Sequence, residues 1–392
     1  MKSLKQIRTL ADLAINGAPP AFEKPLHVGR PNIGSKERFY ELAEQMFERR
    51  WLTNNGPLVQ ELEKKVAEYH EVKHCVAMCN GTIALEIAIR ALGLEGEVIV
   101  PSYTFIATVH ALHWQAITPV FADIDPATHT LDPEAVKKMI TPRTTGIIGV
   151  HTWGNVCDTE TLQSIAGEYD LKLMYDAAHA FGCSRNGTLI GNFGECEVLS
   201  FHATKFFNTF EGGAVLTNSD ELAEQMRLMR NFGFAGLDNV IYPGTNGKMS
   251  EIAAAMGLVN LDEVESIIET NRRNHDLYKN GLKDVPHLSL LSFDPAERNN
   301  FQYVVVEVEK NSLVSRDSLV DALHAENVLA RKYFWPGCHV MHPYKELYPH
   351  ADQHLVNTST VADRVMVLPT GTSINEETIV TVTEVMRLLI ES

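Results

Sequence analysis

A single lysine stands among aromatic and small residues in the segment 200–213, which reads SFHATKFFNTFEGG. Burying an ammonium group without a partner is costly, so Lys205 either extends its amine to solvent or belongs to a site that holds the amine for chemistry. A lysine amine in apolar surroundings has a lowered pKa and can form Schiff bases with carbonyl compounds. Taken alone, such a lysine more often has a structural role.

A carboxylate follows one of the predicted buried strands. Asp176 is the first polar residue after the strand LKLMY, and it is followed by Ala177, Ala178 and His179. A carboxylate at the end of a buried strand needs a partner, and a protonated heterocyclic nitrogen would serve. An aspartate that caps the next turn is the alternative.

Asn80, Gly81 and Thr82 lie between the short apolar segment CVAMC and the helical segment GTIALEIAIRALGL. Glycine permits close backbone approach, and a helix N-terminus offers free N–H groups, so this turn suits a phosphate. Capping of the helix by Asn80 or Thr82 would explain the same residues. Neither G-x-G-x-x-G nor G-x-x-x-x-G-K-[ST] occurs, so neither a Rossmann dinucleotide site nor a P-loop is predicted.

These groups occur in an order that suits one class of cofactor chemistry. A pyridoxal-phosphate enzyme needs a phosphate cradle, a stacking ring, a carboxylate for the pyridine nitrogen and an amine for the aldehyde. The sequence offers the turn at Gly81, an aromatic segment, Asp176 and Lys205 in that order. We therefore predict pyridoxal 5′-phosphate as the cofactor.

A second pattern points to different chemistry. His70-Glu71-Val72-Lys73-His74 matches H-E-x-x-H, which on a helix places two zinc ligands and a general base on one face. Here the motif falls at the end of a predicted helix, and Glu86 is a poor third ligand. A zinc hydrolase that uses His70, Glu71 and His74 is a remote alternative, and we predict no metal site.

Composition narrows the class of protein. The 392 residues, 45% apolar and 21% charged, are typical of a globular chain with more than one domain. A formal net charge of −16 argues against nucleic acid or an anionic membrane as partner. Six cysteines spread over this length form no disulfide framework, and Cys75 and Cys79 lack the second pair of a zinc site. Without a signal peptide or a run of ~18 apolar residues, we expect a cytoplasmic protein.

Strand and helix patterns alternate from about residue 36 to residue 320, beginning with helical periodicity over 36–50 and 58–70. The strands, among them EVIVPS, TPVFADI and TGIIGVHT, are apolar on both sides, which predicts a mostly parallel sheet covered by helices. Ligands bind such sheets where strands end and helices begin. The segment 249–282 reads as one long helix, continuous or broken, that leads into a smaller α+β domain, with strands near FQYVVVEV and DRVMVLPT and helices near 315–327 and 376–390.

Four ordered segments together resemble the DegT/DnrJ/EryC1/StrS family of nucleotide-sugar aminotransferases: VPSYTFIATVHAL, DAAHAFG, SFHATKFFNTFEGG and GTNGKMSEIAAAMGL. The likeness extends from about Gly29 to the C-terminus. It implies an α/β protein with the PLP-dependent transferase fold of type I. Residues 1–265 would form the large PLP-binding domain with its mostly parallel sheet, and residues 266–392 the small C-terminal domain. The N-terminal segment would pack on the small domain.

The resemblance also implies roles for residues around the cofactor ring. Lys205 would form the Schiff base with the aldehyde and later move a proton between the substrate carbon and the cofactor. Asp176 would pair with the pyridine nitrogen, and His179 would lie near the phenolic oxygen. Phe105 would stack on the ring, a role for which Tyr103 is the less favoured alternative.

Other residues would bind the phosphate. By the resemblance these are Gly81, Thr82 and Ser200, together with Asn246 of a neighbouring subunit, which implies a homodimer with shared active sites. Lys248 stands where the family commonly has arginine, so a role that needs a bidentate guanidinium is in doubt.

The segment 330–344, ARKYFWPGCHVMHPY, resembles relatives that aminate C4 of a dTDP-4-keto-6-deoxyhexose. The expected reaction converts dTDP-4-keto-6-deoxy-D-glucose to dTDP-4-amino-4,6-dideoxy-D-glucose with L-glutamate as amino donor. Amination at C3 of a dTDP-3-keto-6-deoxyhexose is the alternative. Arg30, Lys332 and His339 are the candidate substrate contacts, although exposed basic residues often have no such role.

Overall fold

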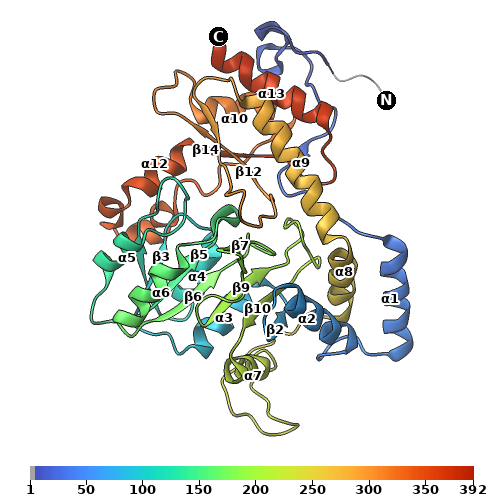
Figure 1. The fold of residues 1–392 in the computed structure, drawn as a ribbon, viewed down its shortest axis with the longest axis vertical. Coiled ribbons are helices and arrows are strands. Elements are labelled where there is room, and N and C mark those ends of the chain that lie inside the picture. Colours follow the sequence, from blue (N-terminus) through green and yellow to red (C-terminus); the bar gives the residue numbers. More distant parts are fainter. Residues whose placement is uncertain (1–4) are drawn as a thin grey trace.

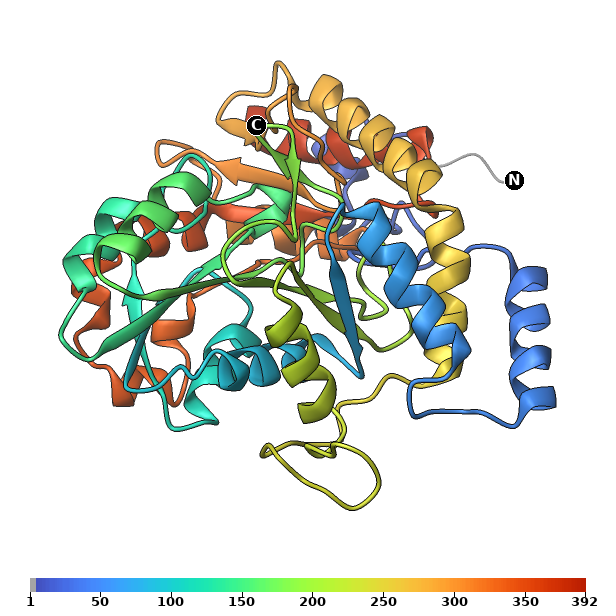
Figure 2. The same cartoon turned by 60° about the horizontal axis from the view of Figure 1, so that its bottom comes forward.

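A seven-stranded sheet forms the centre of the computed structural model, which describes residues 5–392 (Figures 1 and 2). Its strands are β2 (His74–Met78), β3 (Glu97–Pro101), β4 (Thr118–Ala122), β5 (Thr144–Val150), β6 (Lys172–Asp176), β9 (Cys196–Ser200) and β10 (Gly213–Thr217). Their order is β2-β10-β9-β6-β5-β3-β4. All run in one direction except β10, which is antiparallel to both of its neighbours. The prediction of a mostly parallel sheet is confirmed.

Helices cover both faces of this sheet because its strands are apolar on both sides. Val98 and Val100 of β3 pack in one core with α3 (Gly81–Ala91), α4 (Ile106–His113) and α7 (Asp220–Met229). Ile99, which points to the opposite face, packs with α5 (Pro133–Met139) and α6 (Thr159–Glu168). Over β2 and β10 that second face is covered by α2 (Pro57–Tyr69) and α8 (Glu251–Asp262).

The C-terminal part is a smaller α+β unit, as predicted. Strands β11 (Leu288–Leu290), β12 (Val304–Val308) and β14 (Val365–Leu368) form an antiparallel sheet. It packs with α9 (Val264–Leu282), α10 (Arg316–Ala325) and α13 (Glu376–Glu391) (Figure 1). The predicted long helix breaks at Glu263, between α8 and α9, so the domain boundary expected at residues 265 and 266 falls in the first turn of α9.

Several short elements have no clear signal in the sequence. They are β1 (Leu26–His27), β7 (Ser184–Arg185), β8 (Thr188–Leu189), β13 (Val328–Leu329), α11 (Tyr344–Leu347) and α12 (Val356–Arg364), with 3-10 turns at Leu10–Asp12, Ala14–Asn16, Thr152–Gly154, Cys338–Val340 and Ala351–His354. A two-residue strand carries too little periodicity to be recognised.

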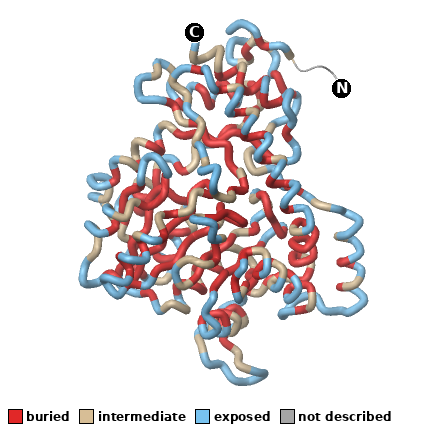
Figure 3. Tube along the Cα trace, in the orientation of Figure 1, coloured by how far each residue is buried: buried red, intermediate tan, exposed pale blue. Residues whose placement is uncertain are grey.

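Two parts of the chain extend away from the body: α1 (Lys36–Arg49) and the loop between α7 and α8 (Figures 1 and 3). Both expose large apolar side chains. Tyr40 and Phe47 are two-thirds exposed on α1, and their spacing of seven residues puts them on one helix face. Leu237 and Ile241 are exposed in the loop. Apolar side chains gathered on protruding elements are typical of a contact surface.

Over residues 5–392, no helix has the length and apolar character needed to cross a membrane.

The N-terminal segment is held by one buried carboxylate. Glu326, at the C-terminal end of α10, accepts hydrogen bonds from the backbone N–H groups of Ala14 (2.5 Å) and Ala21 (2.6 Å). The neighbouring Asn327 donates from Nδ2 to the carbonyl of Phe22 (2.7 Å). Parallel pairing of β1 with β13 continues this contact. A buried carboxylate with two N–H donors is well satisfied, and its loss would leave both donors unpaired.

We predict that Glu326→Ala loosens the N-terminal segment selectively. Two hydrogen bonds to a charged acceptor contribute about 3 kcal/mol, so trypsin should cleave after Arg8 up to about a hundredfold faster. Mass spectrometry of timed digests measures the rates, and Glu44→Ala on the exposed side of α1 is the control. Equal cleavage of the two variants would contradict this function of Glu326.

Candidate active site

One cavity of about 320 Å³ brings together most of the predicted site residues. It lies where β6 and β9 end and α3 and α4 begin, which is where open α/β sheets bind ligands. Its volume is at the lower end of the roughly 300–1,000 Å³ typical of small-molecule sites. The predicted residues that line it are Gly81, Thr82, Phe105, Asp176, His179, Ser200 and Lys205.

Lys205 lies in the loop between β9 and β10. A tight turn positions it, because its N–H donates to the carbonyl of His202 (2.8 Å). The side chain is half-buried, and Nζ lies 3.5 Å from the hydroxyl of Tyr303. Burial lowers the pKa of the amine to about 8, although the nearby carboxylate of Asp176 opposes this shift. Near neutral pH the amine therefore exists in both protonation states, as a nucleophile and proton carrier requires.

Asp176 is the last residue of β6, and its carboxylate is almost fully buried. The hydroxyl of Thr108 donates to Oδ2 (2.8 Å) and the N–H of Ala178 donates to Oδ1 (3.1 Å). Burial raises the pKa of the carboxyl group, while these two hydrogen bonds and the Lys205 charge act in the opposite direction. The bond from Ala178 is the turn cap that the sequence offered as an alternative, yet the side chain still lines the cavity.

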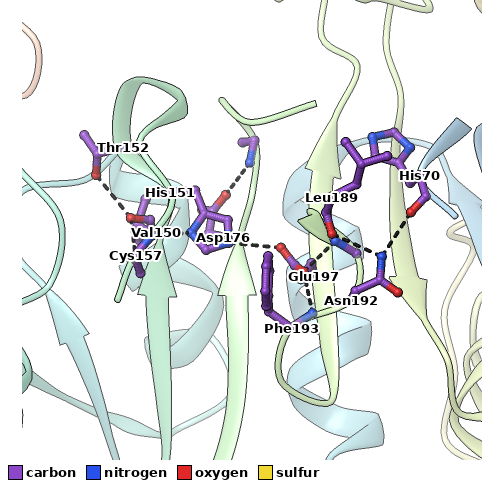
Figure 4. Close-up of polar contacts among 12 residues, drawn as sticks. His70, Val150, His151, Thr152, Cys157, Asp176, Leu189, Asn192, Phe193 and Glu197 are labelled. Carbon is purple, nitrogen blue, oxygen red and sulfur yellow. Dashed lines mark hydrogen bonds and ion pairs between the residues drawn. The ribbon is translucent and has the colours of Figure 1, made fainter. Parts of the chain in front are cut away.

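A second buried pair ties together the strands around Asp176 (Figure 4). The N–H of His151, just after β5, donates to the backbone carbonyl of Asp176 (3.0 Å). Its ring stacks on Tyr175, so it occupies the sheet face opposite the Asp176 side chain. Nδ1 accepts from the N–H of Cys157 (3.1 Å), which leaves Nε2–H to donate to Glu197 of β9 (3.0 Å). The ends of β5 and β6 are thereby fixed relative to β9.

His179 is buried at the edge of the cavity. Burial, with a smaller contribution from the Lys205 charge, holds the pKa of its imidazole well below the usual range, so the ring is neutral. Nδ1 accepts a hydrogen bond from the backbone N–H of Trp153 (3.3 Å). A neutral imidazole whose Nδ1 accepts carries its proton on Nε2, which makes that nitrogen a donor.

The residues at the start of α3 form a cradle for an anion. Asn80 caps the helix through a hydrogen bond from the N–H of Ile83 to Oδ1 (2.8 Å), so the capping alternative is present as well. A Cβ added at Gly81 would lie 3.1 Å from Cβ of Ser200, and one added at Gly213 would lie 2.6 Å from the nitrogen of Gly81. Side chains at these two positions would fill the cradle. The free N–H groups of the first helical turn and the Ser200 hydroxyl suit a phosphate.

The sequence did not indicate three aromatic residues that line the cavity from the C-terminal part. They are Tyr303, Tyr333 and Phe334. The ring of Phe334 stacks on His179 with a centroid distance of 5.6 Å and an interplanar angle of 7°. Tyr333 and Phe334 lie in the segment 330–344, whose resemblance to C4-aminating relatives indicated a substrate class but no role for these rings. Tyr103 is fully buried and donates to the carbonyl of Tyr333 (2.8 Å), whereas Phe105 is exposed at the cavity.

Two predicted residues lie on the surface outside this cavity. Asn246 is exposed at the end of the loop between α7 and α8. Its backbone pairs with that of Asn231 in an isolated antiparallel β-bridge. Arg30 is also exposed. It follows Gly29, whose added Cβ would lie 2.9 Å from the carbonyl of Thr204, a residue that lines the cavity. Arg30 therefore stands beside the rim.

The other two predicted substrate contacts already have partners within the chain. Lys332 pairs with Asp317 (3.1 Å) and lies over the ring of Trp335. His339 is buried, and its Nδ1 lies 2.7 Å from the hydroxyl of Ser102. Neither side chain lines the cavity.

The H-E-x-x-H pattern does not form a metal site. Helix α2 ends at Tyr69, and Glu71 has a left-handed backbone (φ 56°), so the two histidines share no helix face. His70 is buried, its pKa is lowered to about 4 by burial, and its Nε2 accepts from the N–H of Gly182 (3.1 Å). His74 instead contacts Asp220. Over the described residues 5–392, no three His, Cys, Asp or Glu side chains are arranged to hold a metal ion.

Comparison with known proteins identifies relatives over nearly the whole chain. The DegT/DnrJ/EryC1/StrS aminotransferase family matches residues 34–387. A dTDP-4-amino-4,6-dideoxy-D-glucose transaminase of Shigella dysenteriae is 40% identical, over 88% of this chain and 94% of its own. A GDP-perosamine synthase of Caulobacter vibrioides is 34% identical, over 82% and 87%. The crystal structure of DesI in the presence of its TDP-sugar product superimposes with a TM-score of 0.94 at 48% identity, over 97% of each chain.

We predict that the amine of Lys205 reacts at lower pH than an ordinary lysine. In cofactor-free protein, acylation followed by peptide mass spectrometry should show half-maximal reactivity near pH 8, because the amine is protonated and unreactive below its pKa. In Asp176→Asn the midpoint should move lower still, since the carboxylate raises the pKa of Lys205. Exposed Lys310 in the same digest is the reference. A midpoint near the usual ~10.4 would contradict the prediction.

Proposed function

The chain belongs to the DegT/DnrJ/EryC1/StrS aminotransferase family, and we propose that it aminates C4 of dTDP-4-keto-6-deoxy-D-glucose to give dTDP-4-amino-4,6-dideoxy-D-glucose, with L-glutamate as donor. The observation that carries the proposal is a cavity uniting Lys205, Asp176, His179 and the start of α3 in a chain 40% identical to a transaminase of that name. The likeness to DesI at 48% identity supports the same substrate class.

We propose pyridoxal 5′-phosphate as the cofactor of this site. When bound, it supplies an aldehyde that accepts and passes on the amino group and a ring that draws electrons from the substrate carbon. The cradle at Gly81, Thr82 and Ser200 fits the phosphate, because glycine leaves open the space that a Cβ would fill. The carboxylate of Asp176, buried within the same cavity, fits a protonated ring nitrogen.

Lys205 carries the proton transfers in this proposal. A pKa of about 8 would let Nζ of Lys205 move a proton between the substrate carbon and the cofactor. Neither the uptake nor the release of the proton would have a large energetic cost. The adjacent hydroxyl of Tyr303 limits where Nζ can move. The carboxylate of Asp176 would stabilise a positive charge on the ring nitrogen of the cofactor. Hydrogen bonds from Thr108 and Ala178 keep this carboxylate oriented.

The remaining groups would orient the ring and exclude water. Nε2–H of His179 is a donor that fits a phenolate oxygen. Phe105 offers an exposed flat face at the cavity, which suits stacking. Tyr303, Tyr333 and Phe334 add aromatic surface to the cavity lining, and a drier site strengthens the electrostatic contacts inside it.

We expect that the purified protein, given L-glutamate and dTDP-4-keto-6-deoxy-D-glucose, forms an amine at C4 that NMR of the product identifies. Lys205→Ala should lower kcat by at least about 10²–10⁴-fold, because both nucleophile and proton carrier are lost. Lys310→Ala, a surface change, should leave the rate unaltered.

Two further substrates sharpen this test. A dTDP-3-keto-6-deoxyhexose examines the C3 alternative, and a GDP-linked 4-keto sugar examines the nucleotide, given the similarity to GDP-perosamine synthase. An amine at C3, or preference for the GDP sugar, would replace the proposed substrate. No transfer from glutamate to any keto sugar would refute the proposal.

We further propose a homodimer whose subunits complete each other's active sites. The apolar face of α1 with Tyr40 and Phe47, and the protruding loop with Leu237 and Ile241, are exposed in the single chain. A second copy would bury them, as symmetric dimers commonly do. Asn246, at the end of this loop and outside its own cavity, would then reach the phosphate of the neighbouring subunit.

Mixing two inactive variants tests the shared site. Lys205→Ala and Asn246→Ala should each be poor enzymes. After dissociation and remixing in equal amounts, about half of the dimers are mixed, and each mixed dimer has one intact site, so about one quarter of wild-type activity should return. If Asn246 served its own subunit, remixing would restore nothing.

We also propose a cytoplasmic location without nucleic-acid or membrane partners. All six cysteines are free thiols, and all but Cys79 are buried, which is typical of a reducing compartment. The net charge of −16 disfavours binding to polyanions.

A further inference from the structure

Trp153 lies directly behind His179 but does not line the cavity. It is fully buried within the 3-10 turn Thr152–Gly154 that follows β5. Its indole is nearly parallel to the ring of His179 (centroids 5.9 Å apart, 15° between planes) and to that of Phe334 (5.1 Å, 14°). Three nearly parallel, stacked rings from three distant segments therefore fix one another's orientation.

The backbone of Trp153 also determines the protonation of the His179 ring. Its N–H donates to Nδ1 of His179 (3.3 Å), and an N–H cannot accept, so Nδ1 has to be the acceptor nitrogen. Trp153 has φ 65° and ψ 0°, a left-handed conformation that is rare for a bulky residue. Such a conformation persists only where the surroundings hold it, and it is concentrated at functional sites.

A hydrogen bond from the indole nitrogen of Trp153 helps to keep the residue in this conformation. Nε1–H of Trp153 donates to Nδ1 of buried His129 (3.0 Å). Nε2 of His129 has no hydrogen-bond partner within the described residues and lies 4.0 Å from a carboxylate oxygen of Glu307 on β12. Glu307 is itself paired with Arg364. A chain of contacts thus extends from the C-terminal sheet through Trp153 to the cavity.

We propose that Trp153 is a positioning residue that keeps His179 in the Nε2–H tautomer, with its donor directed at the bound cofactor or substrate. The inference rests on the proposed function, since a fixed donor matters only if a ligand accepts from it. The ring sets the plane of His179, the backbone N–H selects the tautomer, and His129 keeps Trp153 in place. Trp153 touches no ligand and acts only through His179.

Nitrogen NMR of the purified holoenzyme with ¹⁵N-labelled histidine tests the proposal directly. The His179 signals are those that disappear in His179→Gln. Wild-type protein should show an unprotonated Nδ1 and a protonated Nε2. Trp153→Ala keeps the backbone N–H but removes the stacked indole and its bond to His129, so the turn relaxes and the His179 ring can rotate away from that N–H. Both tautomers should then appear, and kcat should fall about 10–100-fold, by analogy with the loss of groups that orient metal-ligating histidines.

Trp153→Phe separates the contacts of Trp153 with His179 from its hydrogen bond to His129. It also remains informative if the alanine variant does not fold. It keeps a stacking ring and the backbone N–H but removes the indole donor. The His129 signals should then shift while His179 stays in the Nε2–H form. Tyr278→Ala is the control, because it removes an equally buried ring from the separate core around α9 and should leave the His179 signals unchanged.

Three results would overturn the proposal. They are a protonated Nδ1 on His179 in the wild type, unchanged His179 signals in Trp153→Ala, and unchanged His129 signals in Trp153→Phe. The NMR result does not depend on turnover. A correct tautomer in a protein that transfers no amine would therefore refute the proposed function alone, and full transfer with a free His179 would refute only the role of Trp153.

Discussion

Burial of an amine and a carboxylate in one cavity is the constraint on which the site depends. Burial favours the uncharged form of each group, whereas the charge of each favours ionisation of the other. For Lys205 the outcome is a pKa near 8, and for Asp176 it is a raised pKa opposed by two hydrogen bonds. Neither group could be changed alone without moving the protonation equilibrium of its partner. The surrounding sheet serves to keep this pair at a fixed separation and degree of burial.

The orientation of β10 places the lysine within that sheet. Because β10 runs antiparallel between β2 and β9, the loop that carries Lys205 turns back over the carboxyl ends of both neighbours. The return brings Gly213 against Gly81, so close that a Cβ would lie 2.6 Å from the Gly81 nitrogen. Glycine at the end of the loop is therefore required for the start of α3 and Ser200 to meet. The same turn that delivers the amine also builds the anion cradle.

Sequence patterns predicted those parts of the molecule that local periodicity encodes. The strand that ends at Asp176 and the helix that begins at Gly81 were each predicted from apolar spacing and turn residues, whereas the long helix over 249–282 was predicted without a position for its break. The direction of β10 was not predicted, because strand pairing depends on contacts far apart in sequence. Tyr303 was missed for the same reason, since it reaches Lys205 across 98 residues without any motif. H-E-x-x-H at His70 was given only a remote role because a helix end was predicted there, and α2 does end at Tyr69.

The charge of the cavity bears on how an anionic substrate could bind. Lys205 is the only lysine or arginine among the described residues that line the cavity, and Glu211 adds a negative charge. A nucleoside diphosphate and glutamate are both anionic, and the chain as a whole carries a net charge of −16. The proposed substrates therefore need cations from outside the lining. Within the chain, Lys332 is already paired with Asp317, whereas Arg30 stands exposed beside the rim. The proposed shared dimeric site fits this need, because a neighbouring subunit would add positive charge to that of Arg30.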